Sequence, residues 1–187
     1  MEGYPYTKKG EPDLRNSASL GIIPRAITEL YDRIGYAEEK SDLAYTVYVS
    51  YLQLYQEKIF DLLNPAFSKK ESLQGPGLKL RWNKLDVFTV ENLYNFECRT
   101  PDELMYFYQQ GIQNKVVASH NLNHASSRSH CIFTITVEQT DANRPDNTII
   151  SKLQLVDLAG SERQKDTGTS DKMAKESIDI NKSLFNL

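Results

Sequence analysis

The sequence has little that would suit a secreted, membrane-spanning or nucleic-acid-binding protein. It contains two cysteines, Cys98 and Cys131, which are too few for a disulfide scaffold and are typical of a reducing compartment. No run of about 18 apolar residues occurs, so the sequence predicts no membrane-spanning helix. The polar N-terminus lacks the apolar stretch of a secretory signal. The net charge is −3, which gives no reason to expect a nucleic-acid partner.

What the sequence does have is the composition of a cytosolic globular protein. Its 187 residues are 40% hydrophobic and 25% charged, and helical and strand patterns are mixed along the chain, which indicates the α/β class. Residues 44–55 are apolar on both faces and rich in Val, Tyr and Thr, which is typical of a strand inside a sheet. Apolar residues at helical spacing predict a helix that begins near Pro24; its apolar face comprises Ile23, Ile27, Leu30, Tyr31 and Ile34.

A second helix is predicted from a capping box in the middle of the chain. Thr100 is the cap, a proline follows at the first helical position, and Glu103 stands three residues after the cap. Before this helix, the sequence predicts a surface loop over residues 64–79 and short β-segments over 80–96. After it, a polar loop is expected over residues 119–129.

Two strands and a last helix are predicted in the C-terminal third. Apolar and polar residues alternate over 131–138, and a second strand is expected at 148–156, with the turn-rich segment 141–147 between them. A last helix is expected to begin near Met173. These elements complete the α/β prediction.

An acid at the end of an apolar strand is the sharpest chemical feature. The segment LQLVDLAG carries Asp157 at the end of the predicted strand and Gly160 just beyond it. This arrangement is similar to the metal-side strand of phosphate-loop NTPases, where the acid holds Mg²⁺ directly or through water. A glycine there lets a backbone N–H approach the γ-phosphate. Alone, however, the motif favours a structural role, because an aspartate in a turn is common.

A second feature is the loop segment NHASSRSH at residues 123–130. Three hydroxyls, an amide and an arginine lie just before an apolar strand. Hydroxyls can ligate Mg²⁺ or orient a water, and an arginine can pair with an acid or a phosphate. Backbone capping by the serines is the ordinary explanation. The DLAGSE segment thirty residues later changes that balance, because the two segments can meet at one sheet edge.

Together these segments resemble the motor domain of kinesins. NHASSRSH is similar to their switch I motif and VDLAGSER to their switch II motif; KESIDINKSL resembles the start of their relay helix, and GIIPR and VSYLQLYQEKIFDLL resemble further kinesin segments. The matches follow the family order along nearly the whole chain. The resemblance implies a phosphate-loop NTPase motor fold, with a central β-sheet flanked by helices, and a microtubule-stimulated ATPase that uses ATP and Mg²⁺.

The resemblance also implies roles at the nucleotide. Ser127 would ligate Mg²⁺, and Asp157 would hold the water shell of the metal. Ser126 would help to place the attacking water at the γ-phosphate, and the Gly160 N–H would sense that phosphate. Asn123 would lie near the phosphate products. Such a phosphoryl transfer works mainly by positioning and charge stabilisation.

Coupling to the microtubule is implied by residues outside the phosphate site. Arg128 and Glu162 would form a salt bridge that joins the two switches when the site closes, which makes both part of the catalytic set. Asn181 and Lys182, in the last helix, would face the microtubule. The implied partner is tubulin and the implied location is the cytoplasmic microtubule cytoskeleton.

One required motif is not present in these residues. None of the 9 glycines is followed by lysine, so the phosphate-cradling loop G-x-x-x-x-G-K-[ST] does not occur. Met1–Gly3 matches residues that follow this loop in the family, and Leu187 falls inside the relay helix. We therefore expect residues 1–187 to be part of one motor domain that is incomplete at both ends. Without the N–H nest and the lysine, these residues alone should bind ATP poorly and turn it over negligibly.

Other site chemistries fit the sequence less well. A GTP-binding switch protein would need N-K-x-D, whereas residues 181–184 read NKSL, and a serine hydrolase would need G-x-S-x-G, whereas 159–163 read AGSER. A zinc site would lack the usual paired spacing among its possible ligands, which are His120, His124, His130 and Cys131.

The alternative that stays open is a non-catalytic, kinesin-like module that binds microtubules or serves a structural role. Such a module would keep the two switches as scaffold after losing nucleotide binding. An abandoned site has no chemical need for six intact switch residues, which argues against this alternative; they are Ser126, Ser127, Arg128, Asp157, Gly160 and Glu162.

Overall fold

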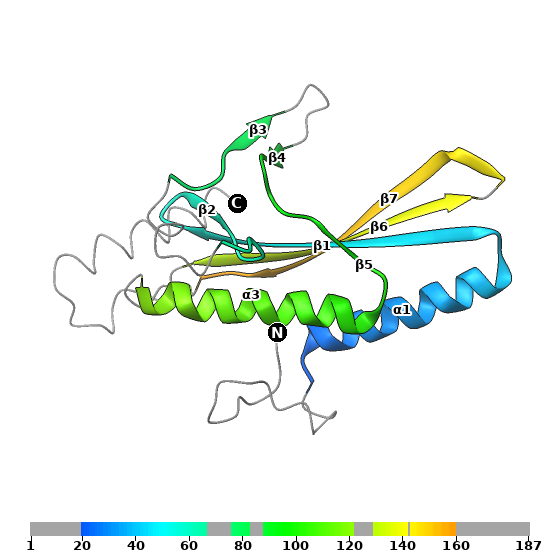
Figure 1. The fold of residues 1–187 in the computed structure, drawn as a ribbon, viewed down its shortest axis with the longest axis horizontal. Coiled ribbons are helices and arrows are strands. Elements are labelled where there is room, and N and C mark those ends of the chain that lie inside the picture. Colours follow the sequence, from blue (N-terminus) through cyan, green and yellow to red (C-terminus); the bar gives the residue numbers. More distant parts are fainter. Residues whose placement is uncertain (1–19, 67–75, 83–87, 122–128, 142, 160–187) are drawn as a thin grey trace. The chain divides into compact units, whose positions relative to one another are not determined.

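The computed structural model describes residues 20–66, 76–82, 88–121, 129–141 and 143–159 (Figure 1). Two helices and seven strands are named in these ranges. In chain order they are α1 (Ile22–Lys40), β1 (Leu43–Tyr55), β2 (Lys58–Asp61), β3 (Leu80–Trp82), β4 (Phe88–Val90), β5 (Phe96–Cys98), α3 (Pro101–Asn121), β6 (His130–Asp141) and β7 (Arg144–Asp157). In these ranges no helix is long and apolar enough to cross a membrane.

Strand β1 lies inside the main sheet, as its two-sided apolar pattern predicts. The sheet has five strands in the order β2-β1-β6-β7, and β5 also pairs with β1. Both β2 and β5 run antiparallel to β1, with Leu52 opposite Asp61 and Val47 opposite Cys98. Strands β3 and β4 form a separate antiparallel pair. The mixture of helices and sheet confirms the α/β class.

The capping box predicted for the second helix is present with one shift. The Glu103 amide donates to Thr100 Oγ1 at 3.2 Å, as expected. The Glu103 carboxylate, however, accepts from the amide of Arg99 at 2.7 Å rather than from the cap residue itself. The predicted start of α3 is therefore confirmed. Helix α1 begins at Ile22, two residues before the predicted Pro24.

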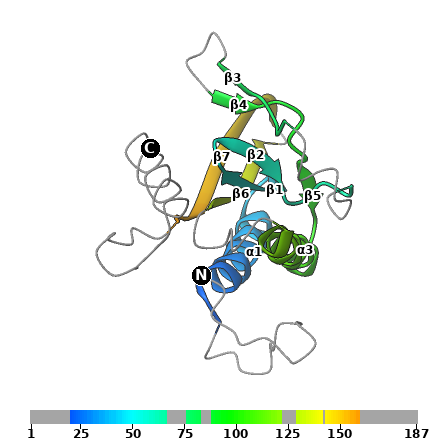
Figure 2. The same cartoon turned by 90° about the vertical axis from the view of Figure 1, so that its left-hand side faces the viewer.

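The chain divides into two compact units, and the first comprises Met1–Val49, Phe96–Tyr108 and Thr134–Leu155. In this unit α1 and the first turns of α3 lie side by side on one face of the strands (Figures 1 and 2). The rings of Phe96 and Phe107 stack with centroids 4.5 Å apart. Buried apolar side chains line the helix–strand contact, among them Ile23, Ile27, Val47, Val49 and Leu104.

The second unit comprises Ser50–Asn95, Gln109–Phe133 and Val156–Leu187. In this unit the Tyr51 ring meets Phe133 edge-on, with centroids 5.2 Å apart. Asp61 is buried here and closes the turn after β2. Its Oδ1 accepts from the Leu63 amide at 2.8 Å and its Oδ2 from the Tyr94 amide at 2.7 Å. Burial raises the pKa of Asp61, and these amide contacts offset part of that effect.

Two predicted loops are shorter than the sequence pattern suggested. Helix α3 continues to Asn121, into the predicted loop at 119–129, because Ser, His and Asn cost a helix little when nothing else breaks it. The predicted turn at 141–147 is mostly strand, since β7 begins at Arg144. The Asn143 amide donates to Asp141 Oδ1 at 2.8 Å, and this local bond helps the chain to pass from β6 to β7 within very few residues.

Candidate functional site

The C-terminal end of β7 presents a carboxylate that is held by a lysine. Asp157 Oδ2 lies 2.8 Å from Lys115 Nζ, and the two residues are 42 positions apart in the sequence. The Lys115 side chain is only 14% exposed, whereas that of Asp157 is 54% exposed. The ion pair therefore holds the Asp157 side chain at the end of β7 and leaves much of the carboxylate in contact with solvent. The role of Asp157 at a bound metal stays a prediction.

Two residues beyond Asp157, the chain is tied to the start of β6. The Ala159 amide donates to His130 Nδ1 at 2.9 Å, and both residues are buried. Burial lowers the pKa of His130, while the nearby Asp157 raises it less. The neutral ring accepts this bond, since a protonated imidazole has no acceptor nitrogen. The bond brings His130, the last residue of the NHASSRSH segment, against Ala159 of the DLAG segment.

The start of β6 is also fixed from the other side, by β1. Gln53 Nε2 donates to Ser129 Oγ at 2.8 Å, and the exposed fractions of the two residues are 0% and 2%. Ser129 directly follows the predicted switch I serines and arginine. A buried polar contact of this kind has few alternative partners, so it fixes the position of the backbone there.

The thiol of Cys131 lies in the same region and stays protonated. Burial raises its pKa to about 11, although the Lys115 ammonium acts in the opposite direction. A thiol with such a pKa is a poor nucleophile at neutral pH, because the thiolate is the reactive form. Within the described ranges, no three His, Cys, Asp or Glu side chains are grouped so as to hold a metal ion. The part of the zinc alternative that can be examined, His130 and Cys131, therefore gains no support.

Most of the predicted site residues lie outside the described ranges. Asp157 is described, at the end of β7, as predicted. The last helix predicted from Met173 is also outside. So are the other predicted site residues, namely Asn123, Ser126, Ser127, Arg128, Gly160, Glu162, Asn181 and Lys182.

Comparison with known proteins decides the family. The family model described as "Kinesin motor domain" matches residues 2–187. The chain belongs to the kinesin motor domain family. The mouse chromosome-associated kinesin KIF4 is 37% identical over 183 residues, which are 98% of this chain and 14% of that protein. Kinesin-related protein 1 of Dictyostelium discoideum is 40% identical over 172 residues, covering 89% of this chain and 8% of that protein.

The solved kinesin structures agree with the described fold. One is the structure of a fast kinesin, described with "implications for ATPase mechanism and interactions with microtubules". It matches with a TM-score of 0.76 and 32% identity, over 90% of this chain and 45% of the other. The kinesin motor fold, predicted from the switch motifs, is thereby confirmed. The chain spans less than half of that kinesin and a much smaller share of its curated relatives.

Sequence reasoning missed the contacts that the described ends of the two switch segments make. Lys115 carried no motif signal, because one lysine in a helix looks like any other until its partner is known. Gln53 is buried in a strand otherwise read as apolar, and a polar residue at such a position was the available signal. His130 was weighed as a zinc ligand, whereas its ring nitrogen accepts a backbone amide.

Proposed function

We propose that these residues form the nucleotide-sensing part of an ATP-hydrolysing microtubule motor. In this proposal the presence or absence of the γ-phosphate on the bound nucleotide controls the affinity for the microtubule. Membership of the kinesin motor domain family supports it. Because the chain spans only part of its relatives, the motor activity is proposed for a longer protein located on the cytoplasmic microtubule cytoskeleton.

The single observation that carries the proposal is the bond between the two switch segments. The amide of Ala159 donates to His130 at 2.9 Å, so the last residue of NHASSRSH contacts the residue before Gly160. The start of β6 and the residues just after β7 therefore lie together, and a phosphate bound there would touch both segments. Ser126 would orient the attacking water there, the Gly160 N–H would sense the γ-phosphate, and Asn123 would lie near the products.

The donor chemistry suits a magnesium ion. Mg²⁺ prefers oxygen ligands and keeps several waters, which fits the hydroxyl of Ser127 and an Asp157 carboxylate acting through water. When bound, the ion would neutralise phosphate charge. Lys115 holds one carboxylate oxygen of Asp157 and so fixes its direction. Arg128 and Glu162 would close the two switches on each other, and Asn181 and Lys182 would carry the change to tubulin.

Strand β7 supports a larger parent domain. It stands last in the described order of the main sheet, yet it exposes large apolar residues; these are Ile149, Ile150, Leu153 and Val156. Strands that are apolar on both faces normally lie inside a sheet. We propose that further strands of the same motor domain pair beyond β7 and that the phosphate loop is carried by that part.

The test is an ATPase assay on the longer natural protein, provided that its sequence contains G-x-x-x-x-G-K-[ST]. Microtubules should stimulate its turnover, and Asp157→Asn should lower the stimulated rate by about 10- to 100-fold, the range for residues that orient a metal-bound water. Asp146→Asn removes the same charge from an exposed position of β7 and should leave the rate unchanged. Residues 1–187 alone should turn over negligibly.

Two results would overturn the proposal. The first is a longer protein that contains the phosphate loop but whose ATP turnover does not respond to microtubules. The second is equal activity of the Asp157 and Asp146 variants. Either would favour the non-catalytic module, which the six retained switch residues and the family membership do not favour.

A further inference from the structure

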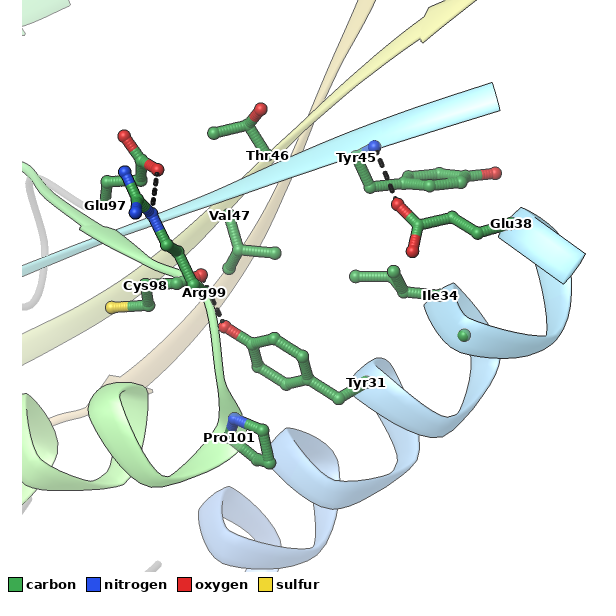
Figure 3. A pocket seen from close by; sticks show the side chains of 11 residues that line it. Tyr31, Ile34, Glu38, Tyr45, Thr46, Val47, Glu97, Cys98, Arg99 and Pro101 are labelled. Carbon is green, nitrogen blue, oxygen red and sulfur yellow. Dashed lines mark hydrogen bonds and ion pairs between the residues drawn. The ribbon is translucent and has the colours of Figure 1, made fainter. Parts of the chain in front are cut away.

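A cavity in the first unit shares no lining residue with the two switch segments. It has a volume of about 400 Å³ and is bounded by the second half of α1, the start of β1 and the β5–α3 junction (Figure 3). Ligand pockets usually measure about 300–1,000 Å³, so it is large enough for a small molecule. Its apolar and aromatic lining includes Tyr31, Ile34, Tyr45, Val47 and Pro101.

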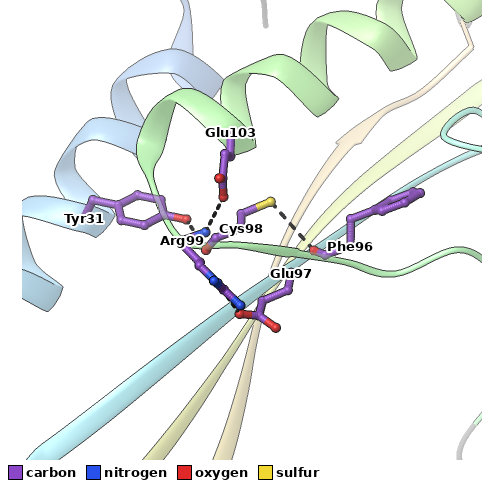
Figure 4. A network of polar contacts seen from close by, with 6 residues as sticks. All are labelled: Tyr31, Phe96, Glu97, Cys98, Arg99 and Glu103. Carbon is purple, nitrogen blue, oxygen red and sulfur yellow. Dashed lines mark hydrogen bonds and ion pairs between the residues drawn. The ribbon is translucent and has the colours of Figure 1, made fainter.

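The Tyr31 hydroxyl and the Cys98 thiol of the lining are already hydrogen-bonded within the protein, so aromatic ring faces and carboxylates are the groups that can contact a ligand. The Tyr31 hydroxyl donates to the Cys98 carbonyl at 2.8 Å, so its polar end is used by the β5 backbone. Burial raises the pKa of the Cys98 thiol to about 12, and the thiol is neutral. Its Sγ donates to the Phe96 carbonyl, as Figure 4 shows. Neither group brings a charge to the cavity.

Charge is concentrated at the two ends of the cavity. At one end the Arg99 guanidinium pairs with Glu97, Nε to Oε1 at 2.9 Å, and the two charges cancel (Figures 3 and 4). At the other end Glu38 lies beside Tyr45, and its Oε1 accepts from the Tyr45 amide at 3.2 Å. The second oxygen of Glu38 has no partner among the described residues. One negative charge is therefore left over, next to an aromatic ring.

We propose that this cavity binds a small organic cation, with its ammonium group at Glu38 and a flat apolar body along the aromatic and aliphatic lining. The charge favours a cation over a neutral molecule or an anion, because the lone guanidinium of the lining is already paired. The rings of Tyr31 and Tyr45 suit a flat body and can also attract a cation. This binding does not depend on the proposed motor function.

A larger side chain at Gly35 can fill the cavity and so test whether a ligand binds there. Gly35 lies inside α1 and lines the cavity, and a Cβ built there would meet no atom within 4 Å. Gly35→Leu should therefore occupy the space without a clash. Leucine also forms helices better than glycine, so the variant should fold at least as well as the parent chain.

The probe is tryptamine, titrated into the ¹⁵N-labelled chain and followed by amide chemical shifts. Saturable shifts should appear at Thr46, Val47 and Glu97. Tryptophol has the same body with a hydroxyl in place of the ammonium and should bind about two- to fivefold more weakly, as expected for a partly exposed ion pair. Indole-3-propionate, an anion, should bind more weakly still. Shifts that do not saturate, or equal affinity for tryptamine and tryptophol, would overturn the proposal.

Three variants localise the binding. Gly35→Leu should abolish it for all three ligands, and Glu38→Gln should lower the affinity for tryptamine to that for tryptophol. Glu39→Gln makes the same change in net charge at a neighbouring exposed residue that does not line the cavity, and it should bind like the parent chain. The proposal fails if the Glu39 variant loses as much affinity as the Glu38 variant. It fails equally if the leucine variant gives a well-dispersed spectrum and still binds; should that variant misfold, the Glu38 and Glu39 comparison decides.

Discussion

Gly111 of α3 packs against the Tyr51 ring of β1, and replacing it should destabilise the protein. A Cβ at Gly111 would overlap Tyr51 Cδ1 and lie 2.8 Å from Tyr51 Cε1. The ring has little room to retreat, because Tyr51 is 4% exposed and meets Phe133 edge-on. Gly111→Ala therefore forces either the helix or a core ring to move.

The size of the effect follows from two opposing terms. Alanine in place of a helical glycine gains about 1 kcal/mol in helix propensity. Overpacking a core costs about 1–3 kcal/mol, and contact with the body of a held ring belongs at the upper end. We expect a net loss of about 2 kcal/mol for Gly111→Ala from these terms. Gly35→Ala in α1 meets no atom within 4 Å and should gain about 0.5–1 kcal/mol.

Urea unfolding followed by circular dichroism measures both variants against the parent chain. A third comparison places Gly111→Ala in a Tyr51→Leu background, where the ring is gone. The penalty should then shrink or change sign, as a double-mutant cycle would reveal. Equal stability of Gly111→Ala and the parent chain would refute the reasoning. An undiminished penalty in the leucine background would do so as well, because the ring could not then be its cause.

Three further changes test the buried polar groups, each by urea unfolding. Asp61→Asn should cost about 1–3 kcal/mol of stability, because the backbone N–H groups of Leu63 and Tyr94 bond to separate oxygens of Asp61 and asparagine has only one side-chain oxygen. Burial lowers the pKa of His130 below its ordinary 6.5, so the unfolded chain takes up a proton first and stability should fall with pH below that value. His130→Gln should flatten this dependence; an unchanged slope would exclude His130 as its source. Lys115→Met should cost no more than about 1 kcal/mol, since Asp157 is half exposed and solvent screens the pair.

The elements that sequence patterns predicted well are those whose cause is local. The interior position of β1 follows from apolar residues on both of its faces, and the start of α3 from a capping box that spans four residues. The strand that ends at Asp157 was predicted from its apolar run and terminal acid. These signals need no knowledge of distant partners, because burial and capping act through the residues themselves.

The contacts that hold the candidate site could not be predicted in the same way. Lys115 and Asp157 are 42 residues apart, and Gln53 and Ser129 are 76 apart. Their pairing depends on the order of strands in the sheet and on where α3 packs against it, and periodicity encodes neither. The extent of β7 was also underestimated, because backbone ladders extend a hairpin past its apolar residues. Only tertiary structure shows these effects.

The contact between Gly111 and the Tyr51 ring has a consequence for how α3 can move. Because the Tyr51 ring packs against α3 at the one position there that has no Cβ, we expect the contact to resist sliding of the helix along its axis more than tilting about the contact. From Gly111 to the helix end at Asn121 the lever arm is about 15 Å, at about 1.5 Å per residue. A tilt of about 5° would therefore displace that end by about 1.3 Å over this arm. We expect the end of α3 to move by tilting about its contact with Tyr51 rather than by sliding along the helix axis.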